Sequence, residues 1–320
     1  MRRFAARLAA LATALACVVA TLTLATSPAG AAPQYPVPYD FLPSAVVAGV
    51  NFTADPPGAN DWNCRPGAAH PRPVVLVHGL TGDKTTNWQT YAPLLANNGY
   101  CVYALTYGRS PLLPAPYDEA FGGLVPMQQS ARQLHAFVAK VLAATGASQV
   151  DIVGHSEGTV MPDYYAKFLG GARYIHAYVS LAPLWHGTSP LGLATLAALG
   201  TPFGVTPATF TLLAPVCGSC AQFLSGSPFM TAVRSGGTPA VPGIAYTNIV
   251  TRYDELVQPY TSGIQAGMTN EVVQDHCPLD LSEHFEIAAD PVAAALVLNA
   301  LDPAHPRPVP CRPVLPFVGT

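Results

Sequence analysis

The chain has 320 residues, of which 50% are hydrophobic and only 10% are charged. A chain of this composition buries enough apolar surface to offset the entropy lost on ordering, which excludes intrinsic disorder. The net charge is −3 and lysine and arginine do not cluster, so we do not expect a nucleic-acid partner.

The first residues have the pattern of a secretory signal. A basic start precedes an apolar run over residues 8–24, and small residues follow up to Ala31. This pattern is typical of a peptide that is cleaved on export, and the alternative is a membrane anchor. We therefore expect a signal peptide over residues 1–31 and an extracellular single domain over residues 32–320, with a monomer favoured.

Six cysteines follow this segment, an even number that in an exported chain predicts disulfide bonds. Proximity in the sequence favours the pairs Cys64–Cys101, Cys217–Cys220 and Cys277–Cys311, although spacing alone does not exclude other pairings. A metal or redox site is the alternative for the Cys-Gly-Ser-Cys run. A zinc site would need a second ligand pair, which the sequence lacks, so we expect no metal.

In the remaining chain, segments with the apolar pattern of strands alternate with segments that have the apolar spacing of helices. Residues 33–72, rich in proline, glycine and asparagine, predict an irregular lead-in. Apolar, β-branched runs predict strands at 72–80, 100–108, 149–155, 174–183, 244–251 and 270–275. Helical spacing predicts helices at 87–98, 127–146, 157–171 and from 291, where Asp290 is the expected cap. This alternation predicts an α/β fold with a mostly parallel sheet and helices on both faces.

Residues 184–243 interrupt the alternation. The segment is rich in leucine, alanine, proline, threonine and glycine, and Arg234 is its only charged residue. It either completes the core with extra helices and loops or forms a cap that presents apolar surface to a hydrophobic substrate. Both interpretations stay open.

Ser156 lies where a predicted strand passes into a predicted helix, and Gly154 and Gly158 flank it two positions away on each side. This setting is the one that a nucleophile elbow requires, because the turn is strained and the glycines let neighbouring main chain approach closely. The start of the helix also favours the negative charge of an oxyanion. We therefore expect Ser156 to be a catalytic nucleophile rather than part of an ordinary turn.

A serine hydroxyl needs a base and a group that orients the base. In this fold the acid follows the serine in the chain and the histidine comes last. Asp254 lies just beyond a predicted strand and is the preferred acid, with Glu255 as the alternative. His284 lies ahead of the last helix and is preferred as the base over His276, which adjoins a cysteine expected to be in a disulfide.

An oxyanion hole needs two main-chain N–H donors. One is expected from Glu157, the residue after the serine. The other is expected from the loop after the first strand, where Leu80 is preferred and Thr81 is second. In that loop, His78 precedes Ser156 in the wrong order for a base, so we expect it to shape the loop by hydrogen bonding.

Five stretches together resemble the secreted bacterial class 2 triacylglycerol lipases of the α/β-hydrolase superfamily: RPVVLVHGLTG, DIVGHSEG, SLAPLWHGT, RYDELVQP and CPLDLSEHFEIAADPVAAALVLNAL. The similarity covers most of residues 60–311. It implies an α/β-hydrolase fold and three disulfide bonds. It also implies the triad Ser156, Asp254 and His284, with Leu80 and Glu157 in the oxyanion hole.

The residues and the resemblance predict a secreted serine hydrolase of carboxylic esters that acts on lipids and needs no cofactor. It would make transient contact with a lipid surface. A short-chain esterase, a polyesterase or an acyltransferase would share the same acyl-enzyme, so the sequence does not separate them. A noncatalytic binding module would be expected to lack a triad residue. A peptidase would be expected to have a pocket for a peptide side chain, which nothing in the sequence suggests.

Overall fold

The computed structural model describes residues 34–109, 113–189, 191–192, 195 and 217–320. All of them belong to one compact unit, Pro33–Thr320. The expected signal peptide lies outside the described residues, and so does part of the segment 184–243, including 196–216. Within the described ranges, no helix has the length and apolar character needed to cross a membrane.

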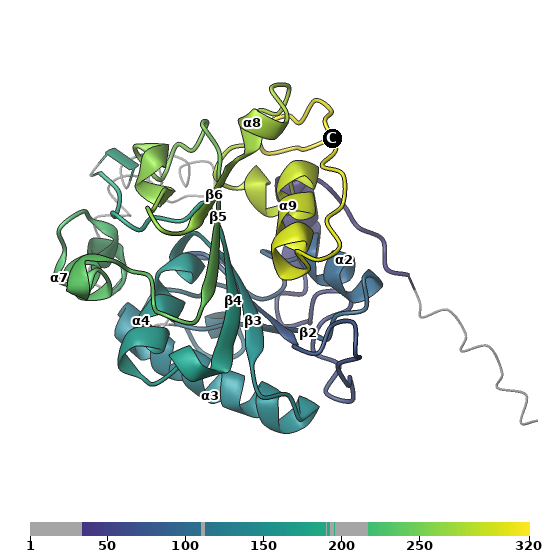
Figure 1. The fold of residues 1–320 in the computed structure, drawn as a ribbon, viewed down its shortest axis with the longest axis horizontal. Coiled ribbons are helices and arrows are strands. Elements are labelled where there is room, and N and C mark those ends of the chain that lie inside the picture. Colours follow the sequence, from purple (N-terminus) through teal and green to yellow (C-terminus); the bar gives the residue numbers. More distant parts are fainter. Residues whose placement is uncertain (1–33, 110–112, 190, 193–194, 196–216) are drawn as a thin grey trace, which may run out of the picture. The chain divides into compact units, whose positions relative to one another are not determined.

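The core of the fold is a six-stranded sheet with the strand order β2-β1-β3-β4-β5-β6, in which every neighbouring pair is parallel (Figure 1). The predicted parallel sheet is therefore confirmed. Because the chain passes from β1 to β2 and then returns to β3 on the other side of β1, the order reverses at β1. Ligands bind at such a reversal in open α/β sheets. The strands are β1 Val74–Val77, β2 Val102–Leu105, β3 Val150–His155, β4 Ile175–Leu181, β5 Ala245–Val250 and β6 Thr269–Val272.

Both faces of the sheet are buried. In β1, Val75 and Val77 belong to one hydrophobic cluster, whereas Val74 and Leu76 belong to another on the opposite face. Successive side chains of a strand point to opposite faces, so a strand covered on both sides must be apolar throughout. This explains why the strands stand out in the sequence as continuous apolar runs.

Helices cover the two faces in separate layers. Helices α3 (Met127–Thr145), α4 (Met161–Phe168) and α7 (Pro228–Val233) contribute buried side chains to the first cluster. Helices α2 (Tyr91–Asn97) and α9 (Pro291–Leu301) contribute to the second and lie on the other side of the sheet (Figure 1). The predicted helices at 87–98, 127–146 and 291–301 correspond to α2, α3 and α9.

Sequence signals set the ends of two of these helices. At the start of α9, the Asp290 carboxylate accepts a hydrogen bond from Ala293 N–H at 2.6 Å, which satisfies a donor that the first turn leaves free. Gly146 follows α3 with a φ of 73°, a left-handed conformation that glycine adopts without a Cβ penalty.

Three segments differ from the sequence expectation. The lead-in contains a helix, α1 (Phe41–Gly49), whose cap Asp40 accepts from Ser44 N–H at 3.1 Å. The helix expected at 157–171 begins as a 3-10 turn and becomes α-helical only in α4. The strand expected at 270–275 ends early, and its second half forms the short helix α8 (Val273–His276).

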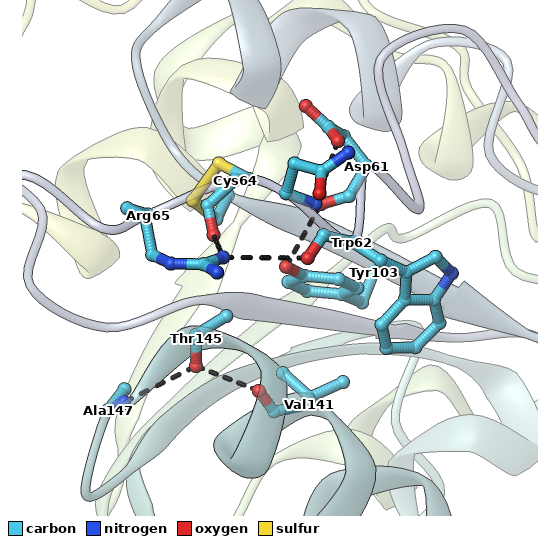
Figure 2. The surroundings of a disulfide bond; sticks show 10 residues. Asp61, Trp62, Cys64, Arg65, Tyr103, Val141, Thr145 and Ala147 are labelled. Atoms are coloured by element: carbon cyan, nitrogen blue, oxygen red, sulfur yellow. Dashed lines mark hydrogen bonds between the residues drawn. A yellow bond between two sulfur atoms is a disulfide. The ribbon is translucent and has the colours of Figure 1, made fainter.

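The cysteines form the three pairs that proximity favours: Cys64–Cys101, Cys217–Cys220 and Cys277–Cys311. Figure 2 shows the first, which ties the lead-in to the residue before β2, next to Trp62 and Tyr103. The first and third bridges span 37 and 34 residues, whereas the second spans 3. A longer loop restricts the unfolded chain more, so the first and third bridges are expected to stabilise the fold more than the second.

Candidate active site

Ser156 lies in the sharp turn between β3 and the helical segment after it. The strand ends at His155, and a 3-10 helix begins at Ser156 itself. Ser156 has a φ of 54°, in the left-handed region, where a residue with a side chain costs roughly 1–3 kcal/mol. The fold thus holds this side chain in a strained turn, which is the geometry of a nucleophile elbow.

The two flanking glycines are required by close approach of main chain. A Cβ on Gly154 would overlap the carbonyl oxygen of Gly158, and a Cβ on Gly158 would overlap the carbonyl oxygen of Val77 in β1. Both obstacles are backbone atoms, and the second lies within a packed strand. Neither can turn aside as the end of a flexible side chain could.

Replacing Gly158 with alanine is expected to lower the free energy of unfolding by about 3 kcal/mol or more, because the new methyl group would press on β1. Gly67→Ala is the matched control, since a Cβ at that position meets no atom within 4 Å. Denaturant unfolding followed by circular dichroism measures both variants. Equal midpoints would contradict the close approach.

Asp254, His284 and Ser156 meet at the carboxyl edge of the sheet. His284 Nδ1 lies 2.9 Å from each carboxylate oxygen of Asp254, and His284 Nε2 lies 2.8 Å from Ser156 Oγ. Asp254 and His284 are both buried. In this arrangement the ring is able to take the hydroxyl proton while the carboxylate fixes the ring and balances its charge.

The alternative acid and base have other partners. His276 lies in α8, where its Nε2 is 2.8 Å from Glu271 Oε2 on β6. Glu255 directs an oxygen to the main-chain N–H of His284, 3.2 Å away, and not to the ring. Neither residue occupies the position of a base or of its carboxylate partner beside Ser156.

Opposing effects set the pKa of His284. Burial disfavours the imidazolium and lowers the pKa, but the charge and hydrogen bond of Asp254 raise it, as do the nearby carboxyls of Glu255 and Glu283. The net pKa lies above the ordinary value of the side chain. The surroundings therefore stabilise the imidazolium that forms whenever the ring accepts a proton.

The loop after β1 carries the candidate oxyanion donor Leu80. Thr81 N–H donates to Gly122 O at 2.9 Å, and Gly122 N–H donates to Gly82 O at 2.8 Å. Thr81 N–H is therefore occupied, whereas no acceptor among the described residues pairs with Leu80 N–H. These contacts favour Leu80 over Thr81 as the donor. The second candidate donor is the N–H of Glu157, in the first turn after β3.

Residues 122–124 form a brace against this loop, and they were not among the site residues predicted from the sequence. Gly123 lies against the carboxyl group of Glu157, and its own carbonyl oxygen accepts from Ser219 Oγ at 2.5 Å. Ser219 belongs to the small loop closed by the Cys217–Cys220 bridge. This disulfide therefore restricts the position of the hydroxyl group that contacts Gly123. The pair of adjacent glycines in FGGL was the only signal in the sequence.

The brace also encloses the Glu157 side chain, which is fully buried. Burial raises the pKa of its carboxyl group well above the ordinary value, and both carboxyl oxygens are buried with no hydrogen-bond partner among the described residues. Burial therefore disfavours the carboxylate form of Glu157 next to the candidate oxyanion hole.

His78 fixes the start of the loop after β1, which carries Leu80 and is called the oxyanion loop below. Its Nδ1–H donates to Gly79 O at 2.7 Å, and its Nε2 accepts from Tyr107 N–H at 3.2 Å. Burial lowers the pKa of His78 to about 4, so the ring is neutral near pH 7 and carries a single proton, on Nδ1. Its partners are main-chain groups, as expected for a residue that shapes the loop.

A cavity of about 160 Å³ opens beside Ser156 and His284. Helix α1 contributes Phe41 and Ala45 to its wall, and the rest is mostly apolar. Such a lining suits an apolar ligand group. Within the described part of the chain, no three histidine, cysteine, aspartate or glutamate side chains converge to hold a metal ion. The larger apolar residues of the wall are Leu80, Leu184, Phe223, Leu256, Val257 and Phe285.

A parallel sheet with a strained serine turn after its third strand defines the α/β-hydrolase class. Comparison with protein families then identifies the family. Residues 71–297 match the family described as lipase (class 2). The match covers more than half of the chain, and the chain belongs to this family.

Two curated relatives are triacylglycerol lipases. That of Burkholderia plantarii is 36% identical over 131 residues, which are 39% of this chain and 32% of the relative. That of Pseudarthrobacter phenanthrenivorans is 38% identical over 104 residues, which are 31% of this chain and 29% of the relative. The matched region thus spans about a third of the length of each relative.

Solved structures show the same fold at low identity. The chain is similar to Aspergillus fumigatus lipase B with a TM-score of 0.57 and 20% identity, over 80% of this chain and 57% of the other. It is similar to a Bacillus licheniformis lipase in its mature form with a TM-score of 0.50 and 17% identity, over 75% of this chain and 94% of the other. At these identities the likeness supports the fold alone.

Proposed function

We propose that the chain is a serine ester hydrolase and that its main substrates are triacylglycerols. The observation that carries the proposal is the hydrogen-bonded line from Ser156 through His284 to Asp254 beside an apolar cavity. The named activity of the two relatives supports the substrate class, although each is matched over only part of its length.

In the proposed reaction, Ser156 Oγ attacks the ester carbonyl carbon as His284 Nε2 takes its proton. The N–H groups of Leu80 and Glu157 donate to the oxyanion of the tetrahedral intermediate. His284 then gives the proton to the departing alkoxide. Water enters, loses a proton to His284 and attacks the acyl-enzyme. His284 then returns this proton to Ser156 Oγ as the bond to the acyl group breaks, which releases the acid and restores the serine.

The surface around the cavity supports a lipid substrate over a small soluble ester. Phe41 and Ala45 of α1 line the cavity, while Val46, Val47 and Val50, within and just after this helix, are exposed. The helix carries no charged residue, so this surface suits transient contact with aggregated lipid.

We also propose that residues 1–31 are a signal peptide and that the domain 32–320 acts outside the cell. Three disulfide bonds support export, because such bonds persist in oxidising compartments. Residues 184–243 are proposed to cap the site. Leu184 and Phe223, two described residues of this segment, line the cavity in support of that role.

The test uses residues 32–320 with p-nitrophenyl esters from acetate to palmitate and with emulsified triacylglycerol. We expect hydrolysis of long-chain esters and of the emulsion. The rate should fall as the pH drops through the pKa of His284, which is raised above about 6.5, because only the neutral ring accepts a proton. Failure to cleave any ester would overturn the proposed function. A sharp preference for acetate would replace the lipase with a short-chain esterase.

A further inference from the structure

Both main-chain groups of His284, its N–H and its carbonyl oxygen, are within hydrogen-bond distance of other side chains. The N–H of His284 donates to Glu255 Oε2 at 3.2 Å, and its carbonyl oxygen lies 2.8 Å from His155 Nε2. His155 directly precedes Ser156, and Glu255 directly follows Asp254. The segments that supply the candidate nucleophile and acid therefore also hold the main chain of the candidate base.

His155 is suited to this contact. It is buried, and burial lowers the pKa of its ring to about 3, so the ring is neutral and carries one proton. Both ring nitrogens face oxygen acceptors, and Nε2 is closer to the carbonyl oxygen of His284, at 2.8 Å, than Nδ1 is to Asn87 Oδ1, at 3.1 Å. We therefore place the proton on Nε2, where it is donated to His284.

Asn87 extends this contact to the oxyanion loop. Its Oδ1 accepts from Gly79 N–H at 3.1 Å. His155 thus lies between the loop after β1 and the loop that carries His284, next to the turn at Ser156.

Glu255 makes its contact with the main-chain N–H of His284. One carboxylate oxygen accepts from His284 N–H, while the other is buried with no hydrogen-bond partner among the described residues. The carboxyl group also adds negative charge near the ring of His284 and helps to raise its pKa. Because the carboxyl group of Glu255 hydrogen-bonds the main chain of His284 and not its ring, Glu255 supports the position of the base and does not act as a second acid of the triad.

These contacts matter because His284 lies outside any helix or strand. No ladder of main-chain hydrogen bonds fixes it, yet its ring must meet both Asp254 and Ser156. A displacement of about 1 Å in such a constellation can cost about a hundredfold in rate.

We propose that His155 and Glu255 are positioning residues, which hold the main chain of His284 so that its ring reaches Ser156 and Asp254 together. This inference rests on the proposed function. It adds two residues that act through the main chain of His284 to the three that carry the chemistry.

Two matched pairs of variants test it. His155→Leu removes the N–H donor at similar size, whereas His155→Gln keeps a donor near the position of Nε2. Glu255→Met removes the acceptor, whereas Glu255→Gln keeps one. We expect the Leu and Met variants to lower kcat for ester hydrolysis by about 100-fold with KM near the wild-type value. The two Gln variants should recover most of this loss.

A double variant, His155→Leu with Glu255→Met, tests whether both act on the same group. We expect it to lose less than the product of the two single losses, because either substitution already frees the main chain of His284. Unfolding midpoints identify any variant that does not fold, and the Glu255 pair carries the test if His155→Leu fails. Wild-type kcat in the Leu and Met variants would overturn the proposal, as would equal losses within both pairs.

A readout without substrate separates this inference from the proposed function. The ring proton between His284 Nδ1 and Asp254 should give a downfield NMR signal in wild type and in both Gln variants. The signal should broaden or move in the Leu and Met variants. This pattern in a protein that cleaves no ester would overturn the proposed function but support the positioning. An unchanged signal and kcat in all four variants of an active enzyme would overturn the positioning alone.

Discussion

Ser156→Ala is expected to lower kcat for ester hydrolysis by about 10⁶-fold, because it removes the only hydroxyl that His284 Nε2 contacts among the described residues. The residual rate would come from the cavity and the oxyanion donors, which the substitution leaves in place. Alanine has the same Cβ as serine in the left-handed turn, so the free energy of unfolding should stay near that of wild type. Turnover of p-nitrophenyl butyrate and thermal unfolding measure the two effects.

Ser180→Ala is the matched control for this substitution. Ser180 is buried on β4 beside Gly154 of β3, and its hydroxyl has no hydrogen-bond partner among the described residues. This variant should keep its activity. An alkyl fluorophosphonate should form one covalent adduct with wild type and with Ser180→Ala, and none with Ser156→Ala. Retained turnover or labelling in Ser156→Ala would remove Ser156 from the proposed role.

Much of the sheet could be predicted because its strands are buried on both faces. The run VVLV at 74–77 is fully buried, so its residues are apolar at every position and the strand needs no tertiary information to be recognised. Helix α9 was equally clear, because Asp290 and Pro291 mark its start.

Helix α1 could not be predicted in the same way. None of its residues is buried, so its sequence shows no apolar stripe of helical period, and the prolines and glycines around it are typical of a loop. The helix is fixed by tertiary contacts instead. Phe41 N–H donates to the carboxylate of Glu286 at 3.0 Å, and the ring of Phe41 packs on that of Phe285.

The site residues likewise fall into those that the sequence reveals and those that depend on tertiary contacts. Ser156 and Asp254 each follow a strand that the sequence reveals, so their meeting at one edge of a parallel sheet could be expected from chain order. The brace at residues 122–124 and the hold on the main chain of His284 depend on carbonyl and N–H groups. Apart from proline, which lacks the N–H, all residue types carry the same main-chain groups, so contacts made by these groups leave no pattern in a sequence.

His284→Ala is expected to reduce kcat by about 10⁶-fold, as large a loss as removal of the serine, because the two act as one unit. Without the ring, no other side chain among the described residues is in hydrogen-bond contact with Ser156 Oγ to take its proton, and the carboxylate of Asp254 loses the partner 2.9 Å away. The measurement is kcat for p-nitrophenyl butyrate at a pH where the wild-type ring is neutral. His276→Ala is the parallel control and should stay near wild type, since His276 pairs with Glu271 on β6.

Free imidazole should restore part of the activity of His284→Ala. The substitution leaves a space the size of the ring next to the cavity beside Ser156, and Asp254 stays in place to orient a small base there. Rescue would show that the loss is that of a proton acceptor, because a misfolded site would not respond. Wild-type activity in His284→Ala, together with a large loss in His276→Ala, would assign the base to the other histidine and contradict the 2.8 Å contact between Nε2 and Ser156 Oγ as the route of the proton.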